Sequence, residues 1–295
     1  MRLIVLACVT CLAGAAARAE VSAIDSAGRR VALPAPAVRI VSLAPHATEQ
    51  LFAAGAGARL VAVSDYSDFP AEAKSLPRVG NFAGVNLEAI AALKPDLVVA
   101  WRLEATAASL ARLESLGIPV FYSEPRRLTE IPEAIAALGR LAGTAATATR
   151  EAERLRAELE RLERTYRSRA PVTLFYQVSE SPLMTLGGRH FVSDAIRVCG
   201  GRNIFEALSP MAPIVNVESV LHADPQAIVT ALPEAGDARW RAFWLRFPAL
   251  RAVREGNLFA VPANEMHRHG PRALAATALL CERIDEARRG AQSIR

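Results

Sequence analysis

The sequence is poor in aromatic residues and in cysteine, and it lacks the common catalytic motifs. Aromatic side chains make up 6% of the residues, and only four cysteines occur. There is no G-x-S-x-G nucleophile motif, no H-E-x-x-H zinc motif and no Walker loop for phosphate. No basic block is interleaved with aromatic residues. We therefore expect a protein that is not an enzyme and does not bind nucleic acid.

Apolar residues, by contrast, are plentiful. The chain has 295 residues, of which 52% are hydrophobic, so it can build either one large domain or two medium lobes. Its formal charge of +5 falls to about +3 if Arg2 and Arg18 are removed with a leader. Such a mild excess of positive charge gives no reason to expect a polyanionic partner.

The first 19 residues have the organisation of a secretory signal peptide. Arg2 supplies the positive charge, Leu3 to Ala16 is an apolar run too short to span a bilayer comfortably, and Ala17-Arg18-Ala19 is an A-x-A cleavage site. We expect cleavage after Ala19 and a soluble protein exported to the periplasm. A buried amino-terminal helix is the alternative interpretation.

Removal of the leader leaves two cysteines, Cys199 and Cys281. In an oxidising compartment, a lone pair of this kind is expected to form a disulfide. Two buried free thiols are the alternative. No histidine or cysteine spacing supports a metal site at either residue, so we expect no bound metal.

One stretch of the chain occurs twice. L-E-A-I-A-A-L-K-P-D-L-V-V, residues 87–99, aligns without a gap on V-E-S-V-L-H-A-D-P-Q-A-I-V, residues 217–229. Glu88 meets Glu218 and Pro95 meets Pro225 in this alignment. Each copy predicts a short helix, a proline that ends it, and a buried strand. The repetition favours two similar lobes, although helix-proline-strand junctions are also common by chance in α/β proteins.

The remaining pattern supports an α/β fold with two lobes. Predicted strands and helices alternate with short connections on both sides of one long helical stretch, residues 144–169, which lacks proline and glycine. Its charged face and apolar stripe are typical of a rigid spacer, and one more surface helix is the alternative. We therefore predict a signal peptide (1–19), an N-terminal lobe (20–142), a bridging helix (143–170) and a C-terminal lobe (171–295).

The scarce aromatic residues gather where the predicted strands end. Ligands of open parallel sheets bind beyond the carboxyl ends of the strands. Trp101 and Tyr66 follow two such strands, and we expect them to contact a broad, partly apolar ligand. Plugging of the sheet ends is the alternative role, and for Phe82, Tyr122 and Tyr176 the two roles are equally favoured.

Several of these stretches together are similar to a known family. They are R-I-V-S-L-A-P-H-A-T-E (39–49), S-D-Y-S-D-F-P (64–70), N-L-E-A-I-A-A-L-K-P-D-L-V-V-A-W-R (86–102), C-G-G-R-N-I-F (199–205), the second repeat (217–229) and G-P-R (270–272). The chain resembles the periplasmic substrate-binding proteins of ABC importers for metal chelates, which carry iron siderophores, haem or cobalamin. The S-D-Y-S-D-F-P and W-R stretches are closest to the cobalamin branch.

The resemblance implies two Rossmann-like lobes bridged by one long helix, with a corrinoid such as cobalamin held in the cleft between them. A haem or ferric-siderophore ligand is the alternative. No resident cofactor is implied, and the protein is expected to be a monomer. The implied ligand contacts are Ala44, Pro45, His46, Tyr66, Phe82, Trp101, Arg102, Tyr176, Met184, Glu265 and Met266.

The resemblance also gives the repeated glutamates a role. Glu88 and Glu218 are implied to dock on arginines of the two permease subunits, which act with their ATPase subunits. Stabilisation of a helix start by an acidic residue is the alternative role for each. The chain departs from the family at His46, where a close relative carries asparagine, and at Met211-Ala212-Pro213, where tryptophan can occur.

Overall fold

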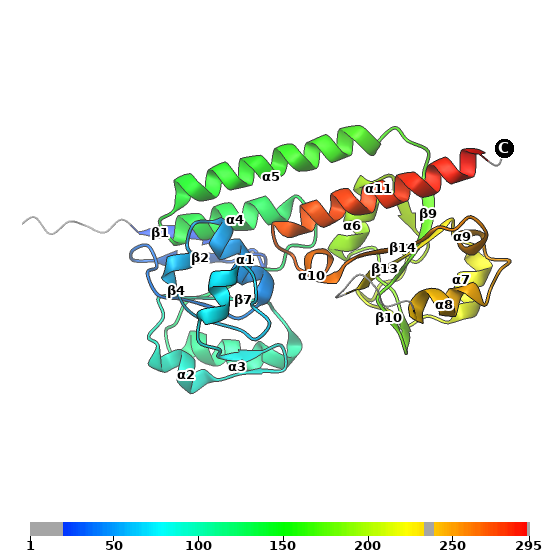
Figure 1. Cartoon of the computed structure of the whole chain (residues 1–295). Helices are drawn as coiled ribbons and strands as arrows, with labels where there is room; N and C mark the ends of the chain where they lie inside the picture. The colour runs from blue at the N-terminus through cyan, green and yellow to red at the C-terminus, as the bar shows by residue number, and fades with distance from the viewer. Residues whose placement is uncertain (1–19, 233–238, 294–295) are drawn as a thin grey trace, which may run out of the picture.

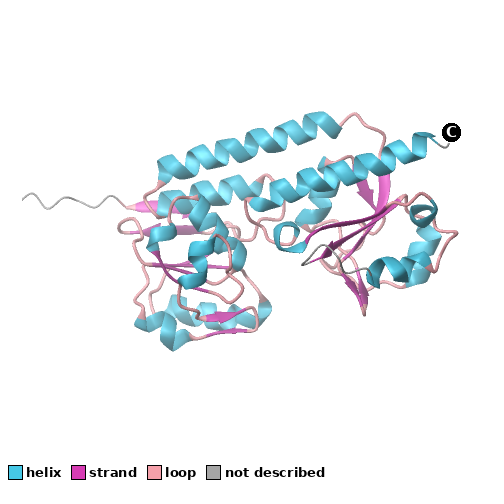
Figure 2. Ribbon diagram, viewed as in Figure 1, coloured by secondary structure: helices cyan, strands magenta, loops and turns pink. Residues whose placement is uncertain are grey.

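The structure is a computed structural model and describes residues 20–232 and 239–293. The predicted signal peptide, residues 1–19, lies outside the described residues. Two four-stranded parallel sheets lie side by side beneath two long helices (Figures 1 and 2). We name the lobes by the predicted boundaries, N-lobe for residues 20–142 and C-lobe for residues 171–295, and the boundaries themselves stay a prediction. No helix in the described ranges is long and apolar enough to cross a membrane.

The N-lobe alternates strands and helices, as expected. Its strands are β1 (Val21–Ile24), β2 (Arg30–Leu33), β3 (Ile40–Ser42), β4 (Leu60–Val63), β5 (Gly80–Asn81), β6 (Gly84–Val85), β7 (Leu97–Ala100) and β8 (Val120–Tyr122). Its helices are α1 (Pro45–Ala53), η1 (Gly57–Arg59), η2 (Ala71–Ser75), α2 (Leu87–Ala92), α3 (Glu104–Ser115) and α4 (Glu130–Leu141). The β5–β6 hairpin is missing from the sequence prediction, because each strand has only two residues.

The C-lobe also alternates strands and helices. Its strands are β9 (Val172–Gln177), β10 (Ser179–Glu180), β11 (Leu183–Met184), β12 (Gly201–Asn203), β13 (Ala227–Leu232) and β14 (Leu258–Pro262). Its helices are α6 (Phe191–Val198), α7 (Val217–Ala223), α8 (Arg239–Leu245), α9 (Arg251–Arg254), α10 (Ala263–Met266) and α11 (Arg272–Ser293). The short elements β10, β11, β12, α9 and α10 were not predicted.

The two sheets share one topology, which confirms the α/β prediction with parallel sheets. The order is β4-β3-β7-β8 in the N-lobe and β12-β9-β13-β14 in the C-lobe. In each sheet, the strand that comes first in the sequence (β3 or β9) has two neighbours. One neighbour is the next strand of that sheet in the sequence, which forms the edge (β4 or β12), and the other is the strand of the repeat (β7 or β13). The repeated sequence therefore occupies the same place in each sheet.

The repeat also has the same local geometry in both lobes. Asn86 and Asn216 cap helices α2 and α7, and the side chain of each accepts an N–H from the residue three positions on. Shortly after these helices end, Lys94 and Asp224 occupy equivalent positions and both have positive φ, 45° and 41°. A chance match would not reproduce the cap, the turn and the strand pairing together. We conclude that the repetition is structural.

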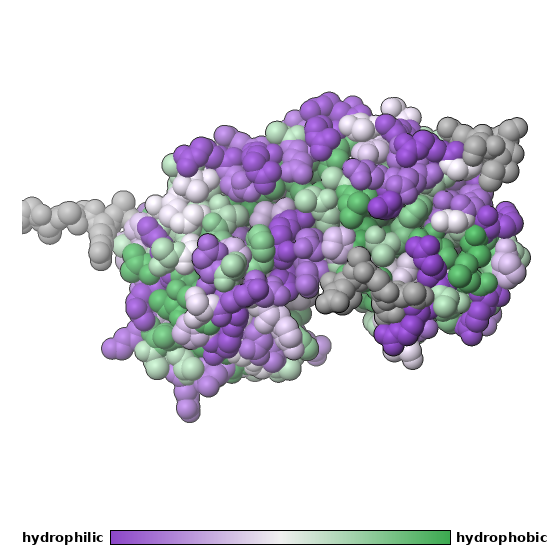
Figure 3. Space-filling view, viewed as in Figure 1, coloured by the Kyte–Doolittle hydropathy of each residue, from purple (hydrophilic) through white to green (hydrophobic). Residues whose placement is uncertain are grey.

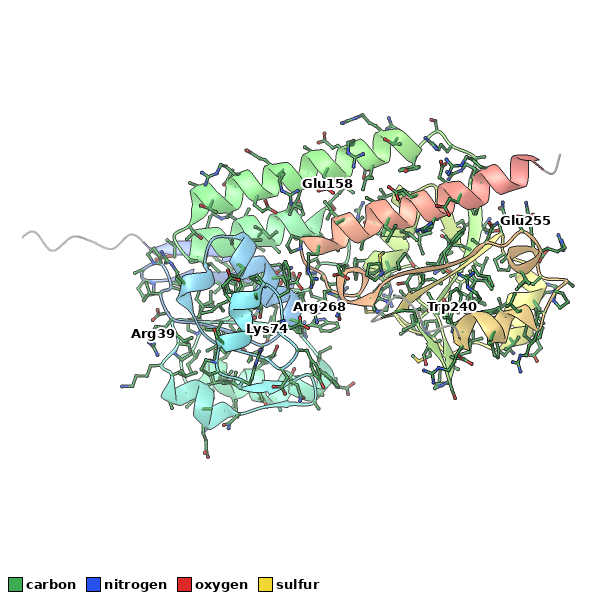
Figure 4. All side chains as sticks on the ribbon, in the orientation of Figure 1. Arg39, Lys74, Glu158, Trp240, Glu255 and Arg268 are labelled. Atoms are coloured by element: carbon green, nitrogen blue, oxygen red, sulfur yellow. A yellow bond between two sulfur atoms is a disulfide. The ribbon has the colours of Figure 1, made fainter. Side chains whose placement is uncertain are left out.

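Helix α5 (Ala145–Tyr166) carries the chain from one sheet to the other. Its inner face is a stripe of Ala148, Ala152, Leu155, Leu159 and Leu162, all buried. It packs on α1 and α4 of the N-lobe and on α6 and α11 of the C-lobe. Its outer face is hydrophilic, and Arg154 pairs there with Glu151 and Glu158 (Figures 3 and 4). The packing on both lobes is what a bridging helix requires.

Helix α11 runs beside α5 along both lobes (Figure 1). Cys281 within it forms a disulfide with Cys199 at the end of α6, and both residues are fully buried. The disulfide prediction is thus confirmed, and the alternative of two free thiols is wrong. The bond joins α11 to α6, so the first residues of α11, which reach the N-lobe, are connected to the C-lobe core.

Candidate functional site

A cavity of about 200 Å³ opens where the N-lobe strands end and faces the C-lobe. Strands β3, β4 and β7 are neighbours in the sheet, and the residues that follow them meet at one edge. The segment after α10 closes the cavity from the C-lobe side. The space-filling view shows a notch between the two lobes on the visible face (Figure 3). The lining residues include Ala44, Pro45, His46, Ser64, Asp65, Tyr66, Phe82, Trp101, His267 and Arg268.

Three aromatic side chains give this cavity its apolar surface. Tyr66 and Phe82 are each 65% exposed, which is unusual for rings of this size in a protein of ordinary composition. Tyr66 has a positive φ of 63°, so the loop after β4 is held in a strained conformation that presents the ring. Trp101 is half-buried and directly follows β7, whose four residues are all buried. A flat ligand would find large apolar contacts here.

Six of the predicted ligand contacts line this cavity: Ala44, Pro45, His46, Tyr66, Phe82 and Trp101. Arg102 does not, because it lines a separate surface hollow beside α4. Met184 lies half-buried in the β10–β11 hairpin and is not a lining residue. Contact between these residues and a ligand remains a proposal.

Three further predicted ligand contacts do not line the cavity: Tyr176, Met266 and Glu265. Tyr176 and Met266 are both fully buried in the core, so neither ring nor thioether faces the cleft. The Tyr176 hydroxyl instead hydrogen-bonds Nε2 of His267 at 3.0 Å, and burial raises the pKa of this phenol. Glu265 accepts a hydrogen bond from Arg272 at 2.7 Å. Each supports the segment that closes the cavity.

Four of the five histidines gather beside the cavity, and two of them, His46 and His267, line it. His269 is packed edge-on against His46 and Trp101, with ring centroids 5.2 and 5.4 Å away, and lies 6.0 Å from His190. Burial lowers the pKa of His46, His190 and His267 to about 4, and that of His269 well below its usual value. These rings are therefore neutral near pH 7. Within the described residues, no group of three or more side chains is arranged to hold a metal ion.

The structure holds His46 in one tautomer. Its Nε2 lies 2.9 Å from the carbonyl oxygen of Ser123, which can only accept, so Nε2 carries the ring proton. Of these four histidines, the sequence pointed only to His46, as a ligand contact. The grouping with His190, His267 and His269 was not predicted, because the four residues come from three separate parts of the chain. A strand-end pattern alone gives no sign of it.

A buried ion pair joins the lobes behind the cavity. Glu49 of α1, with 1% of its side chain exposed, accepts hydrogen bonds from Arg272 at 2.6 Å and from Arg268 at 3.3 Å. Next to it, Gln50 donates from Nε2 to the carbonyl oxygen of His269 at 2.6 Å. Arg268 lies between the two lobes (Figure 4). A Cβ on Gly270 would lie 2.9 Å from a Glu49 oxygen, so the close approach requires glycine.

The repeated glutamates lie away from the cavity, one in each lobe. Glu88 and Glu218 are the second residues of α2 and α7, and both are exposed. Across the described ranges, neither carboxylate has an ion-pair or hydrogen-bond partner within the chain. Figure 1 places α2 and α7 at the outer parts of their lobes, away from α5. The pair thus presents two equivalent negative charges.

The chain is similar in sequence and in structure to proteins that bind vitamin B12. The chain is 40% identical over 252 residues to the vitamin B12-binding protein of Vibrio cholerae, which covers 85% of this chain and 90% of that protein. The crystal structure of the periplasmic vitamin B12 binding protein BtuF of Vibrio cholerae has a TM-score of 0.80 at 39% identity, covering 85% of this chain and 98% of the other.

More distant structures share the fold. The periplasmic heme-binding protein RhuT from Roseiflexus has a TM-score of 0.73 at 24% identity, covering 84% of this chain and 98% of the other, a likeness that concerns the fold alone. Residues 40–265 match the family described as periplasmic binding protein. This match spans most of both lobes and the helix between them. The chain therefore belongs to the periplasmic binding protein family.

Proposed function

We propose that this protein captures a corrinoid, cobalamin or a close relative, in the cleft between its lobes. The observation that carries the proposal is the cavity whose apolar surface comes from Tyr66, Phe82 and Trp101. Stacked rings bind a broad macrocycle with large contact and little loss of side-chain entropy. Support comes from the relative named for vitamin B12 binding, which is 40% identical over 85% of the chain. The protein acts as a receptor rather than an enzyme, and the corrinoid is its cargo rather than a resident cofactor.

The receptor delivers its ligand to an ABC importer from the periplasm, and we propose that Glu88 and Glu218 dock on the permease dimer. Three observations support this docking role. The two glutamates occupy equivalent places in lobes of the same topology, both side chains are exposed, and neither has an ion-pair or hydrogen-bond partner in the described chain. A permease with two similar subunits offers two similar sites, so one charge per lobe gives complementarity. We propose that the protein is a monomer and that both lobes of one molecule dock on the permease together. Residues 1–19, its proposed signal peptide, are removed on export.

A ligand titration followed by tryptophan fluorescence tests the function. Cyanocobalamin, cobinamide, haemin and a ferric siderophore are added separately to the purified protein. We expect saturable quenching by the two corrinoids alone. Saturable binding of haemin or the siderophore alone would contradict the corrinoid assignment and leave the family intact.

Two tryptophan variants localise the quenching. The chain has three tryptophans, and Trp240 and Trp244 belong to a hydrophobic cluster of the C-lobe. Figure 4 shows Trp240 within the C-lobe. Trp101→Phe should remove most of the ligand-induced quenching, whereas Trp240→Phe should leave it in place. If Trp240→Phe removes the signal and Trp101→Phe does not, the ligand binds elsewhere.

A further inference from the structure

We propose that this cavity selects ligands with primary carboxamide groups at their edge over matched ligands in which a carboxylate replaces the amide, and that His46 sets this selectivity. The inference rests on the proposed corrinoid-binding function and deepens it. The periphery of a corrinoid carries acetamide and propionamide chains, whereas haem carries propionates. The chemistry of the polar atoms around the cavity distinguishes the two.

His46 offers an acceptor to the cavity. Its Nε2–H is used by the carbonyl oxygen of Ser123 at 2.9 Å, and a neutral imidazole has no second proton, so Nδ1 presents a lone pair. Among the described residues, Nδ1 of His46 has no hydrogen-bond partner. This atom is also not among the fully buried polar atoms that lack a partner, so it retains some exposure. The ring lines the cavity, so this lone pair is available to a ligand N–H.

The surroundings keep this ring neutral. Burial is the main cause that lowers the pKa of His46 to about 4, and the positive charge of Arg268 lowers it further. The rings packed around it, Trp101 and His269, are uncharged near pH 7. His46 therefore cannot meet a ligand carboxylate as a cation. An oxygen that only accepts would face a nitrogen that only accepts.

Asp65 adds a second acceptor on the same cavity. One of its oxygens, Oδ2, receives Nδ2–H of Asn81 at 3.0 Å, and no cation pairs with the carboxylate within the described chain. A ligand carboxylate near this group would experience repulsion between like charges in a partly desolvated site. A carboxamide N–H₂ would find an acceptor there.

The cation that lines the cavity is already engaged. Arg268 binds Asp68 and Glu49 through the same guanidinium nitrogen, and its side chain is 13% exposed. Arg102, the other candidate cation from the sequence, lines a different hollow. The charge of Arg268 is therefore already balanced by two carboxylates of the chain. A ligand carboxylate would share this cation with both of them and would be repelled by their negative charges.

Donors for a carbonyl oxygen are present as well. The first turn of α1 begins at Pro45, and no side chain caps its free N–H groups. This end of the helix lines the cavity through Ala44, Pro45 and His46. A carboxamide satisfies both sets, with C=O toward the helix and N–H₂ toward His46 or Asp65. A carboxylate satisfies the donors alone and leaves the acceptors unpaired, a loss of about tenfold in affinity per group.

The test compares dissociation constants for a matched ligand pair at pH 7.5. One ligand is cyanocobalamin, and the others are its monocarboxylic acids, each with one peripheral amide hydrolysed. The readout is the ratio Kd(acid)/Kd(amide). For the wild-type protein we expect a ratio of about ten or more for at least one isomer. Equal affinity for cyanocobalamin and every monoacid would overturn the proposal, whereas failure to bind cyanocobalamin at all would overturn the proposed function.

Variants of the two cavity acceptors test which residue causes the difference in affinity between acid and amide. His46→Asn supplies an N–H₂ as well as a C=O, so the ratio for the discriminated isomer should fall to about threefold or less. Asp65→Asn adds a donor at nearly the same volume and should lower the ratio too, which keeps the test open if His46→Asn folds poorly. Glu151→Gln on the outer face of α5 should leave the ratio unchanged. Ratios in both cavity variants that equal the wild-type ratio would contradict the assignment.

Discussion

The two lobes are alike where they build the fold and unlike where they meet the cavity. Both sheets have the same strand order, and the repeated helix in each begins with an asparagine cap followed by a glutamate. The strand ends differ, because the N-lobe exposes Tyr66 and Phe82 there whereas the C-lobe buries Tyr176. The shared part therefore serves folding and the proposed docking. The divergent strand ends give each lobe a different share of the proposed ligand contacts.

The largest expected effect is on transport, and it concerns the two glutamates that the lobes share, Glu88 and Glu218. Reversing both repeated charges, Glu88→Arg with Glu218→Arg, should lower uptake by about a hundredfold, because two positive charges would then face the cationic sites proposed for the permease. Either single reversal should reduce uptake less. Transport into vesicles and ligand affinity are measured side by side, and the affinity should stay at the wild-type value because both residues lie outside the cavity. Lost affinity in the double variant would contradict the docking role.

The next effect concerns the contact between the lobes. Glu49→Ala should lower the free energy of unfolding by about 3–5 kcal/mol, because it leaves Arg272 and Arg268 without their buried carboxylate. The matched control is Glu151→Ala, which removes a partner of the exposed Arg154 on the surface of α5 and should cost less than about 1 kcal/mol. Urea denaturation measures both. Similar losses in the two variants would show that the inter-lobe ion pair has no special weight.

The histidine cluster predicts how stability depends on pH. In the unfolded chain these rings protonate near pH 6.5, whereas in the folded protein His46, His190 and His267 stay neutral down to about pH 4. Between these values the unfolded state binds more protons, so the free energy of unfolding should fall as the pH falls, by up to about 1.4 kcal/mol per pH unit for each ring. Below pH 4 these rings should contribute no further slope.

Single variants assign that slope. His190→Asn keeps a capping side chain for α6 and should reduce the slope by about one proton. The control is His222→Asn, since His222 is exposed on α7. Denaturant titrations at pH 4.5, 5.5 and 6.5 measure the slope. An equal change of slope in the two variants would argue against a buried cluster.

The smallest expected effect compares the aromatic contributions of the two lobes. Trp101→Ala should weaken corrinoid binding by about 1–3 kcal/mol if the ring covers part of the ligand. Tyr176→Phe removes only the hydroxyl that bonds His267, so it should cost about 1 kcal/mol or less. Calorimetric titration measures both affinities. The account fails here if Tyr176→Phe weakens binding more than Trp101→Ala does.

The sequence was sufficient for the features that depend on local or repeated patterns. The gapless match of residues 87–99 to 217–229 located the equivalent helices and strands, and an even number of cysteines in an exported chain indicated the disulfide of Cys199 and Cys281. The strand-end argument placed Trp101 and His46 on the cavity. Each of these follows from the period of the chain or from the topology of parallel sheets.

The orientation of single side chains was beyond the sequence. Tyr176 and Trp101 both belong to strand ends, yet one ring packs in the core and the other reaches the cavity, because strands buried on both faces carry no polar alternation to tell them apart. Arg102 follows Trp101 directly and points to another hollow. The histidine cluster joins α1, the start of α6 and the segment before α11. Only tertiary packing brings such residues together.

The most direct test of the central claim is the position of cobalt in a crystal grown with cyanocobalamin. Anomalous scattering at the cobalt absorption edge identifies the metal without reference to any fitted ligand. The account predicts one cobalt site in the cleft, beside Trp101 on the N-lobe and facing His267 and Arg268 on the C-lobe side. A cobalt site on the outer surface of either lobe, or no cobalt at saturating ligand, would contradict it.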